Sequence, residues 1–232
     1  MIDVSSQPPA VSKLDYEEIG VMIKIYYNDN EIVICEKPYG VSSQKSSGDN
    51  MVDMLATQFN CNIYPVHRLD TTTTGLMAFA KTEKSAEVLS KDIANHRLDK
   101  QYLAICHGSV DKTGKMQDFL YHDRIKNKSF VVENKRKGSK EAILEYELLA
   151  ENIDKKLSLV KIHLLTGRTH QIRVQFASRG NMLYGDGKYG SKDNDRIALH
   201  SHILELPHPV TREKISIKSI PCGNIWELFT IE

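Results

Sequence analysis

Short β-rich runs joined by short polar turns constrain the fold of this chain more than any other feature. Residues 142–150 (AILEYELLA) and 157–165 (LSLVKIHLL) are two such runs, and only the six residues 151–156 separate them. A connection this short joins antiparallel strands, because parallel strands need a crossover of a dozen or more residues. The pattern therefore predicts a sheet that contains antiparallel hairpins.

Two segments with the apolar spacing of an amphipathic helix lie between such runs in the first hundred residues. The first follows Asp49, a possible N-cap, and the second follows Thr82, whose hydroxyl is also suited to capping. The second helix is expected to hold His96 and Arg97 in its last turn, where cations favour the negative end of the helix dipole.

A third helix is expected after Thr169, with Ile172 and Phe176 on its buried face and Gly180 as its left-handed stop. Strands and helices thus alternate along the chain, and several strand pairs are joined by short turns. We predict an α+β fold with a central mixed, largely antiparallel sheet and flanking helices. Further strands are expected around the turn at 28–30 and over 76–81, 101–108, 198–209 and 213–220.

The charge of the chain is balanced overall but not locally. The 31 basic and 30 acidic residues give a net charge of +1, so any binding of nucleic acid must rest on local clusters. Residues 124–140 hold seven Lys or Arg against one Glu and show little apolar periodicity. This segment either contacts an RNA backbone or forms a solvated surface loop, and its composition does not decide between them.

Several functional classes are disfavoured by what the sequence lacks. The four cysteines have no CxxC spacing, the histidines show no zinc-ligand spacing, and neither GxGxxG nor GxxxxGK[ST] occurs. We therefore expect no metal and no cofactor. No stretch has the length of a signal peptide core or a membrane helix, so we expect a cytoplasmic protein without membrane contact. Residues 1–20 are expected to form an N-terminal arm, and 21–232 one domain.

The tetrapeptide HRLD occurs twice, and its two contexts differ. The first copy ends at Asp70, ahead of four threonines and a glycine, which predicts a loop between two sheet elements. Such a loop can present a reactive carboxylate, although an aspartate that closes an Asx-turn is an equal alternative. The second copy follows a predicted helix, so its Asp99 is interpreted as structural.

The segment TGRTHQIR concentrates hydrogen-bond donors. Arg168, His170, Gln171 and Arg173 fall within it, and such a set can hold phosphates or keep a buried carboxylate ionised. The alternative is a solvated basic helix face.

Together these segments resemble the RluA family of RNA pseudouridine synthases, from about Ile23 to the C-terminus. The resemblance implies the pseudouridine synthase fold, a catalytic domain over 21–232 without the small N-terminal RNA-binding domain of many relatives, and a cleft for a flipped uridine. It also implies isomerisation of specific uridines in ribosomal or transfer RNA, through cleavage of the glycosidic bond and reattachment of the base through carbon. We expect the protein to act as a monomer. The segments that carry it are EKPYGV, VHRLDTTTTGLMAFAKT, KQYLAICHG, TGRTHQIRVQFASRGNMLYGDGKYG and ALHSHILELPHP.

The resemblance assigns roles to individual residues. It makes Asp70 the essential carboxylate and adds Tyr102 and Arg173 to the catalytic set, and it places Arg68 in handling the flipped nucleotide. We group Arg168, His170 and Gln171 with Arg68 as residues that bind substrate or RNA.

The chain departs from the family pattern at Gln175, at Asn181–Met182 and at Ser201, which bears on substrate details more than on the reaction. Two alternatives remain open: a glycosidase that uses Asp70 with a second carboxylate, and an RNA-binding protein without catalysis.

Overall fold

One continuous sheet organises the molecule. The computed structural model describes residues 22–223 and 225–231, so the expected arm over 1–20 lies outside the described residues. The strand order is β1-β2-β4-β10-β5-β9-β8-β6-β7, with β3 paired to β4 and β11 paired to β10. The strands are β1 (Ile25–Asn28), β2 (Ile32–Lys37), β3 (Tyr64–Pro65), β4 (Thr74–Ala80), β5 (Asp99–His107), β6 (Thr113–Asp123), β7 (Lys128–Val132), β8 (Ser139–Asn152), β9 (Leu157–Leu164), β10 (Leu199–Pro207) and β11 (Lys214–Lys218).

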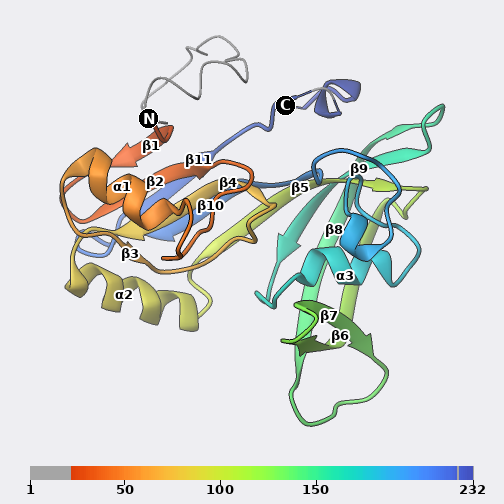
Figure 1. Ribbon diagram of the computed structural model, residues 1–232, viewed down its shortest axis with the longest axis horizontal. Coiled ribbons are helices and arrows are strands. Elements are labelled where there is room, and N and C mark those ends of the chain that lie inside the picture. Colours follow the sequence, from red (N-terminus) through yellow and green to blue (C-terminus); the bar gives the residue numbers. More distant parts are fainter. Residues whose placement is uncertain (1–21, 224, 232) are drawn as a thin grey trace.

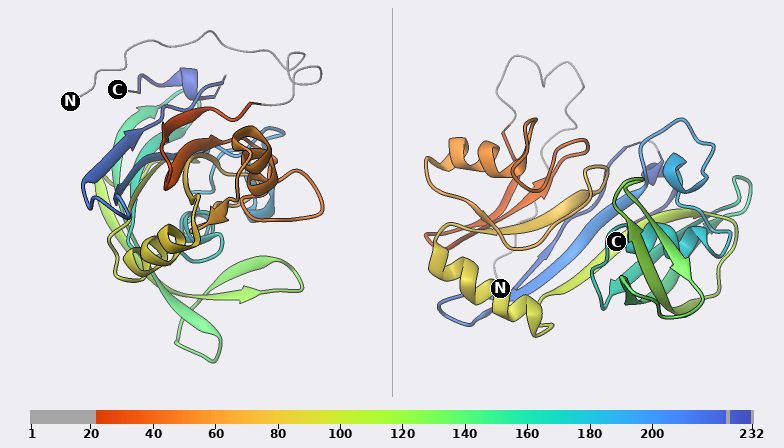
Figure 2. Two further views of the ribbon diagram at one scale, coloured as in Figure 1. Left: turned by 90° about the vertical axis from the view of Figure 1, so that its left-hand side faces the viewer. Right: turned by 60° about the horizontal axis from the view of Figure 1, so that its bottom comes forward.

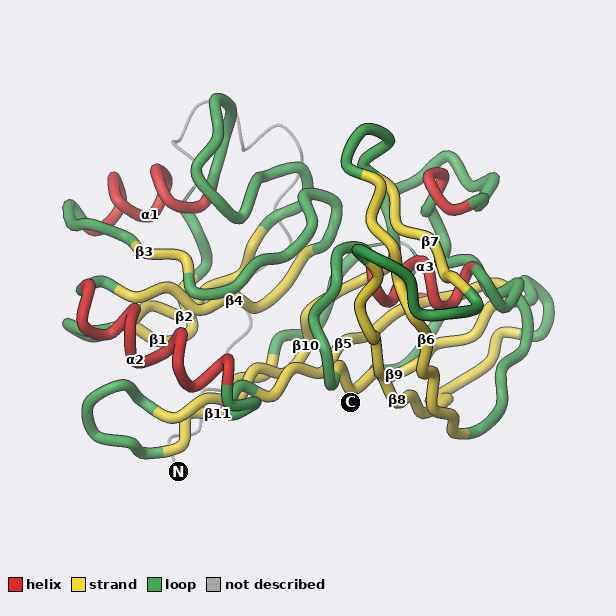
Figure 3. Tube along the Cα trace, turned by 90° about the horizontal axis from the view of Figure 1, so that it is seen from below, coloured by secondary structure: helices red, strands yellow, loops and turns green. Residues whose placement is uncertain are grey.

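The sheet is mixed and largely antiparallel, as predicted. Strands β4 and β10 run parallel, whereas the neighbouring pairs β2 with β4 and β5 with β10 are antiparallel. Figures 1 and 2 show that the sheet is strongly twisted and has two halves, one carrying helices α1 (Met51–Phe59) and α2 (Glu83–Ala94) and the other α3 (Gln171–Ala177). Strands β10 and β5 run between these halves (Figure 3).

Helices α1 and α2 begin at or next to the residues that the sequence indicated. Thr82 caps α2 as predicted, since its hydroxyl accepts from the backbone N–H of Ser85 at 3.1 Å. The cap of α1 is Asn50 rather than Asp49, and its side-chain oxygen accepts from the N–H of Asp53 at 3.0 Å. Helix α2 ends at Ala94, so the expectation that His96 and Arg97 occupy its last turn is wrong.

Helix α3 starts later than expected. Its N-cap is His170, which adopts a left-handed φ of 55° and makes no side-chain capping bond, so Thr169 is not the cap. Gly180 follows the helix with a φ of 86°, in the left-handed conformation that was predicted. The helix therefore begins by a sharp backbone turn, and that turn directs His170 and the residues after it toward the sheet.

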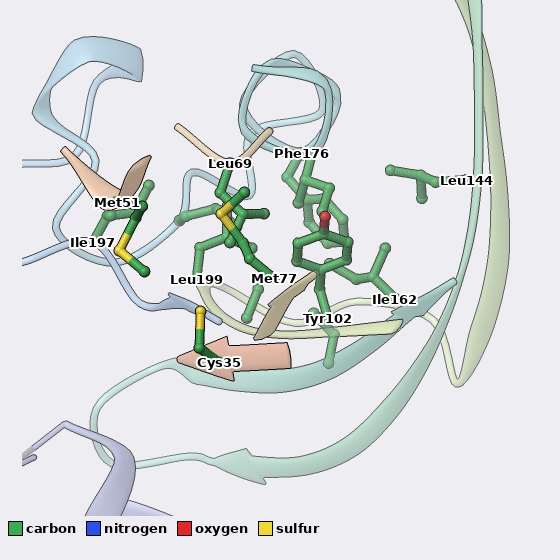
Figure 4. Packing of buried hydrophobic residues seen from close by; sticks show 14 of the residues in the cluster. Cys35, Met51, Leu69, Met77, Tyr102, Leu144, Ile162, Phe176, Ile197 and Leu199 are labelled. Carbon is green, nitrogen blue, oxygen red and sulfur yellow. The ribbon is translucent and has the colours of Figure 1, made fainter. Parts of the chain in front are cut away.

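Strand β4 is buried on both faces because its alternate side chains enter two different hydrophobic clusters. Met77 and Phe79 pack with Leu55 of α1, whereas Leu76 and Ala78 pack on the opposite face. A strand covered on both sides reads as a continuous apolar run, which explains the sequence LMAFA. The first cluster continues through Tyr102 to α3 (Figure 4). The loop before β4 is therefore attached to a strand anchored on both faces.

Candidate active site

A single cavity collects the residues that the sequence predicted as functional. It has a volume of about 530 Å³ and lies among segments 66–73, 93–102 and 164–173. These segments precede β4, join α2 to β5, and connect β9 to α3, so both halves of the sheet contribute. The predicted site residues that line it are Arg68, Asp70, Tyr102, Arg168, His170, Gln171 and Arg173.

The carboxylate of Asp70 forms an ion pair with Arg173 and does not bond to the threonines of its own loop. Nη1 of Arg173 donates to Oδ2 of Asp70 at 3.3 Å, and Nε2 of His170 lies 3.7 Å from the same oxygen. Thr73 donates its backbone N–H to the backbone carbonyl of Asp70 at 2.9 Å. Among residues 22–223 no threonine donates to the Asp70 side chain, so the Asx-turn alternative does not describe this carboxylate.

Arg173 is held in place by a second carboxylate, which sequence reasoning missed. Asp186 accepts from Nε and Nη2 of Arg173, both at 2.7 Å, and both side chains are buried. Burial alone would lower the pKa of the guanidinium, but Asp186 and then Asp70 outweigh it and raise that pKa. This fork leaves Nη1 directed at Asp70. The available signal was the position of Asp186 between two glycines in YGDGKYG.

A buried lysine, also missed, holds the loop of Asp70. Lys37 is 0% exposed, and its Nζ donates to the carbonyls of Pro38, Val41 and Thr71 at 2.7, 2.9 and 3.1 Å. Burial lowers the pKa of this ammonium to about 8, and the charge of Asp70 opposes that shift. The loop carrying Asp70 is thus tied to the end of β2 by a cation. The only sequence signal was the lysine of EKPYGV.

Tyr102 lies in the middle of β5 between its neighbours Ser201 of β10 and Ile162 of β9. It is 4% exposed, and it packs in the first hydrophobic cluster (Figure 4). Tyr102 also lines the cavity. Burial, and then the negative charge of Asp70, raise the pKa of its phenol. Tyr102 is therefore a neutral hydroxyl that can donate a hydrogen bond beside Asp70.

His170 is presented to Asp70 in a defined neutral form. The backbone N–H of Ser129 donates to the hydroxyl of Tyr189 at 2.8 Å, and that hydroxyl lies 2.9 Å from Nδ1 of His170. Tyr189 can then donate to Nδ1, which places the histidine proton on Nε2, the atom facing Asp70. Burial lowers the pKa of His170 to about 4, with Asp70 opposing the shift.

The remaining predicted residues differ in how they are engaged. Gln171 is buried and accepts from Thr166 Oγ1 at 2.8 Å and from the N–H of Arg168 at 3.0 Å, so it shapes the turn before α3. Arg168 donates from Nε to the Glu141 carbonyl at 2.7 Å. Arg68 is exposed at the cavity wall. RNA contact by these residues stays a prediction.

The second HRLD copy has a different environment. Asp99 begins β5, does not line the cavity, and places Oδ1 at 2.6 Å from Nε2 of His163 on the neighbouring strand β9. This contact agrees with a structural role for Asp99. Within residues 22–223 and 225–231, no group of three or more metal-ligating side chains is assembled, and no helix is long and apolar enough to cross a membrane.

Comparisons with known proteins agree with this geometry. A family model described as RNA pseudouridylate synthase matches residues 31–178. The uncharacterized RNA pseudouridine synthase YhcT of Bacillus subtilis is 34% identical over 213 residues, which cover 87% of this chain and 68% of that protein. The tRNA pseudouridine synthase C of Haemophilus ducreyi is 29% identical over 224 residues, which cover 85% of this chain and 90% of that protein. The solved structure of human RNA pseudouridylate synthase domain containing 1 superposes with a TM-score of 0.76 at 21% identity and shows the same fold. The superposition covers 88% of this chain and 86% of the human one.

Proposed function

The chain belongs to the RNA pseudouridylate synthase family, and on that premise we propose that Asp70 carries its reaction. The protein is an isomerase that converts uridine in RNA to pseudouridine. The observation that best supports Asp70 is its position as the one carboxylate among the cavity-lining residues, paired with a buried arginine. Its substrate is a structured transfer or ribosomal RNA, and we propose that it acts as a cytoplasmic monomer.

The reaction breaks the bond between uracil nitrogen and ribose and rejoins the base through a ring carbon. An ionised carboxylate next to the anomeric carbon acts as a nucleophile or stabilises the positive charge that develops there. Arg173 contacts the Asp70 carboxylate from Nη1 at 3.3 Å and fixes its direction. Tyr102 offers a ring face to the uracil and a hydroxyl for proton transfer.

Access to the target requires that the uridine leave its stack, at a cost of a few kcal/mol. Arg68, Lys100 and Arg168 line the cavity and bring positive charge to the place where the phosphates of the flipped nucleotide would lie. The glycosidase alternative needs two carboxylates across the scissile bond, and the described cavity wall supplies Asp70 alone.

Release of tritium from RNA labelled at carbon five of uridine tests this proposal. We expect Asp70→Asn to lower the rate by at least about a thousandfold, as removal of a reacting group does. Asp99→Asn is the matched control, since it changes the same tetrapeptide outside the cavity, and it should keep a rate close to that of the unmodified enzyme. Equal losses in both variants, or release of free uracil, would count against the assignment.

A further inference from the structure

A second cavity lies directly beside the reaction cavity. It has a volume of about 270 Å³ and is formed by the β6–β7 hairpin, the start of β8 and the turn before α3. The two cavities share the wall made by residues 167–169. The residues that line it are Leu120, His122, Arg124, Ser129, Gly138, Lys140, Gly167, Arg168 and Thr169.

The lining of this second cavity is basic. Arg124, Lys140 and Arg168 contribute positive charge, and none of the lining residues is acidic. Two of these cations come from the 124–140 segment, so the structure folds part of that segment into a pocket wall. The pair β6 and β7, which the sequence did not predict, brings Arg124 to this place. Arg168 is fixed by its bond to the Glu141 carbonyl and lines both cavities.

Hydrogen bonds connect the floor of the second cavity to the reaction site. Ser129 is buried, and its Oγ donates to the carbonyl of Thr169 at 2.6 Å. Nδ1 of His122 lies 3.1 Å from the same Oγ and can donate to it. The N–H of Ser129 donates to Tyr189, the partner of His170. The floor of the second cavity is therefore connected by hydrogen bonds, through Tyr189, to the histidine that faces Asp70.

We infer that this second cavity binds a phosphodiester group of the RNA backbone next to the target uridine; the inference rests on the proposed function. A polynucleotide that places one uridine in the first cavity must continue past the shared wall. The cavity offers cations for a phosphate but, apart from His122, no aromatic ring on which a base would stack. Its chemistry therefore fits the backbone and not a second base.

The test compares Lys140→Ala and Arg124→Ala with Lys126→Ala. All three side chains are exposed, so each alanine variant should fold, but Lys126 does not line the cavity. The substrate is total RNA from cells that lack the gene, labelled at carbon five of uridine, and KM and kcat for tritium release are measured between 50 and 200 mM KCl, a range over which phosphate contacts change affinity strongly.

Each cavity variant should raise KM at least about fivefold at the lower salt, and reduce the slope of log KM against log salt by about one. Neither should change kcat, whereas Lys126→Ala should leave both constants unchanged. If Lys126→Ala raised KM as much as the cavity variants do, the hairpin would attract RNA by its overall charge and not through a defined subsite, and the inference would be wrong. An unchanged KM in the cavity variants would also overturn the inference. If the unmodified enzyme released no tritium, the proposed function would fail, and filter binding of the same RNA would still decide the subsite.

Discussion

At the scale of single residues, Arg173 determines how Asp70 is presented, because its guanidinium contacts two carboxylates from distant parts of the chain. The bidentate fork to Asp186 uses two of its nitrogens and leaves Nη1 for Asp70. A buried pair of this kind contributes little net stability, but breaking it is costly because one charge is left uncompensated. We therefore expect Asp186 to be a positioning residue for Asp70, the carboxylate that we propose carries the reaction.

Asp186→Asn should reduce both activity and stability. The variant keeps the shape of the side chain but removes its charge, so we expect the free energy of unfolding to fall by roughly 3 kcal/mol and the tritium-release kcat to fall with it. Urea denaturation and the release assay measure the two effects. Glu87→Gln is the control, since it breaks an exposed ion pair with Lys91 and should leave both the stability and the kcat close to those of the unmodified protein. Unchanged kcat in a folded Asp186→Asn protein would contradict the positioning role.

The residues that sequence reasoning found and those it missed differ in kind. Asp70, Tyr102 and Arg173 stand in motifs whose order along the chain resembles a family, so they could be proposed as site residues without coordinates, and the structure brings them to one cavity. Asp186 and Lys37 act only through contacts formed on folding: one is a counter-ion thirteen residues from its arginine, and the other binds a carbonyl 34 residues away. Neither spacing corresponds to a local pattern of helix or strand.

At the scale of elements, the parallel contact of β4 with β10 places the Asp70 loop over the centre of the sheet. The contact is short and pairs Thr74 with His200 and Gly75 with Ser201. Gly75 has a φ of 105°, and a Cβ there would lie 2.3 Å from the carbonyl oxygen of Ser201. Only glycine permits this approach of two backbones.

Gly75→Ala should therefore destabilise the fold by at least about 2 kcal/mol. The atoms that the new methyl group would overlap are backbone atoms of Ser201, which cannot move away by a change of side-chain rotamer. We also expect a loss of activity, since the strand start follows the Asp70 loop directly. Gly48→Ala is a suitable control because a Cβ at Gly48 meets nothing within 4 Å, and it should change the free energy of unfolding by less than about 0.5 kcal/mol. Similar unfolding curves for the two variants would refute the close-approach argument.

Elements with strong local signals were predicted, and those whose existence depends on tertiary contacts were not. Helix α2 has both a capping threonine and an apolar face, and it was located correctly up to its last turn. Strand β7 has five residues with mixed polarity; it is defined by its pairing with β6 and by Tyr189, which accepts the N–H of Ser129. The left-handed start of α3 at His170 likewise depends on contacts with Tyr189 and Asp70.

At the scale of the whole molecule, three histidines in different regions have lowered pKa values, and of these His170 and His200 are buried and His67 is half-buried. Burial lowers the pKa of His67 to about 3, and those of His170 and His200 to about 4. His67 accepts from the N–H of Ala78 at 3.0 Å, and His200 contacts Thr74 at 2.8 Å and Ser219 at 3.1 Å. In the unfolded chain each would titrate near 6.5.

These shifts determine the sign of the acid response. Between about pH 6.5 and pH 4 the unfolded chain binds protons that the folded protein excludes, so the free energy of unfolding must fall as the pH is lowered through that window. Each pKa unit corresponds to about 1.4 kcal/mol, so one histidine contributes a few kcal/mol at the acid end.

His200→Gln removes one such group, and its unfolding free energy, measured by urea titration at pH 7.0, 6.0, 5.0 and 4.5, should change less steeply than that of the unmodified protein. Because glutamine also loses part of the contact with Thr74 and Ser219, the variant will be less stable at pH 7, and the informative quantity is the slope alone. Parallel pH curves for the two proteins would mean that His200 is protonated equally in the folded and unfolded states, which its burial beside β4 argues against.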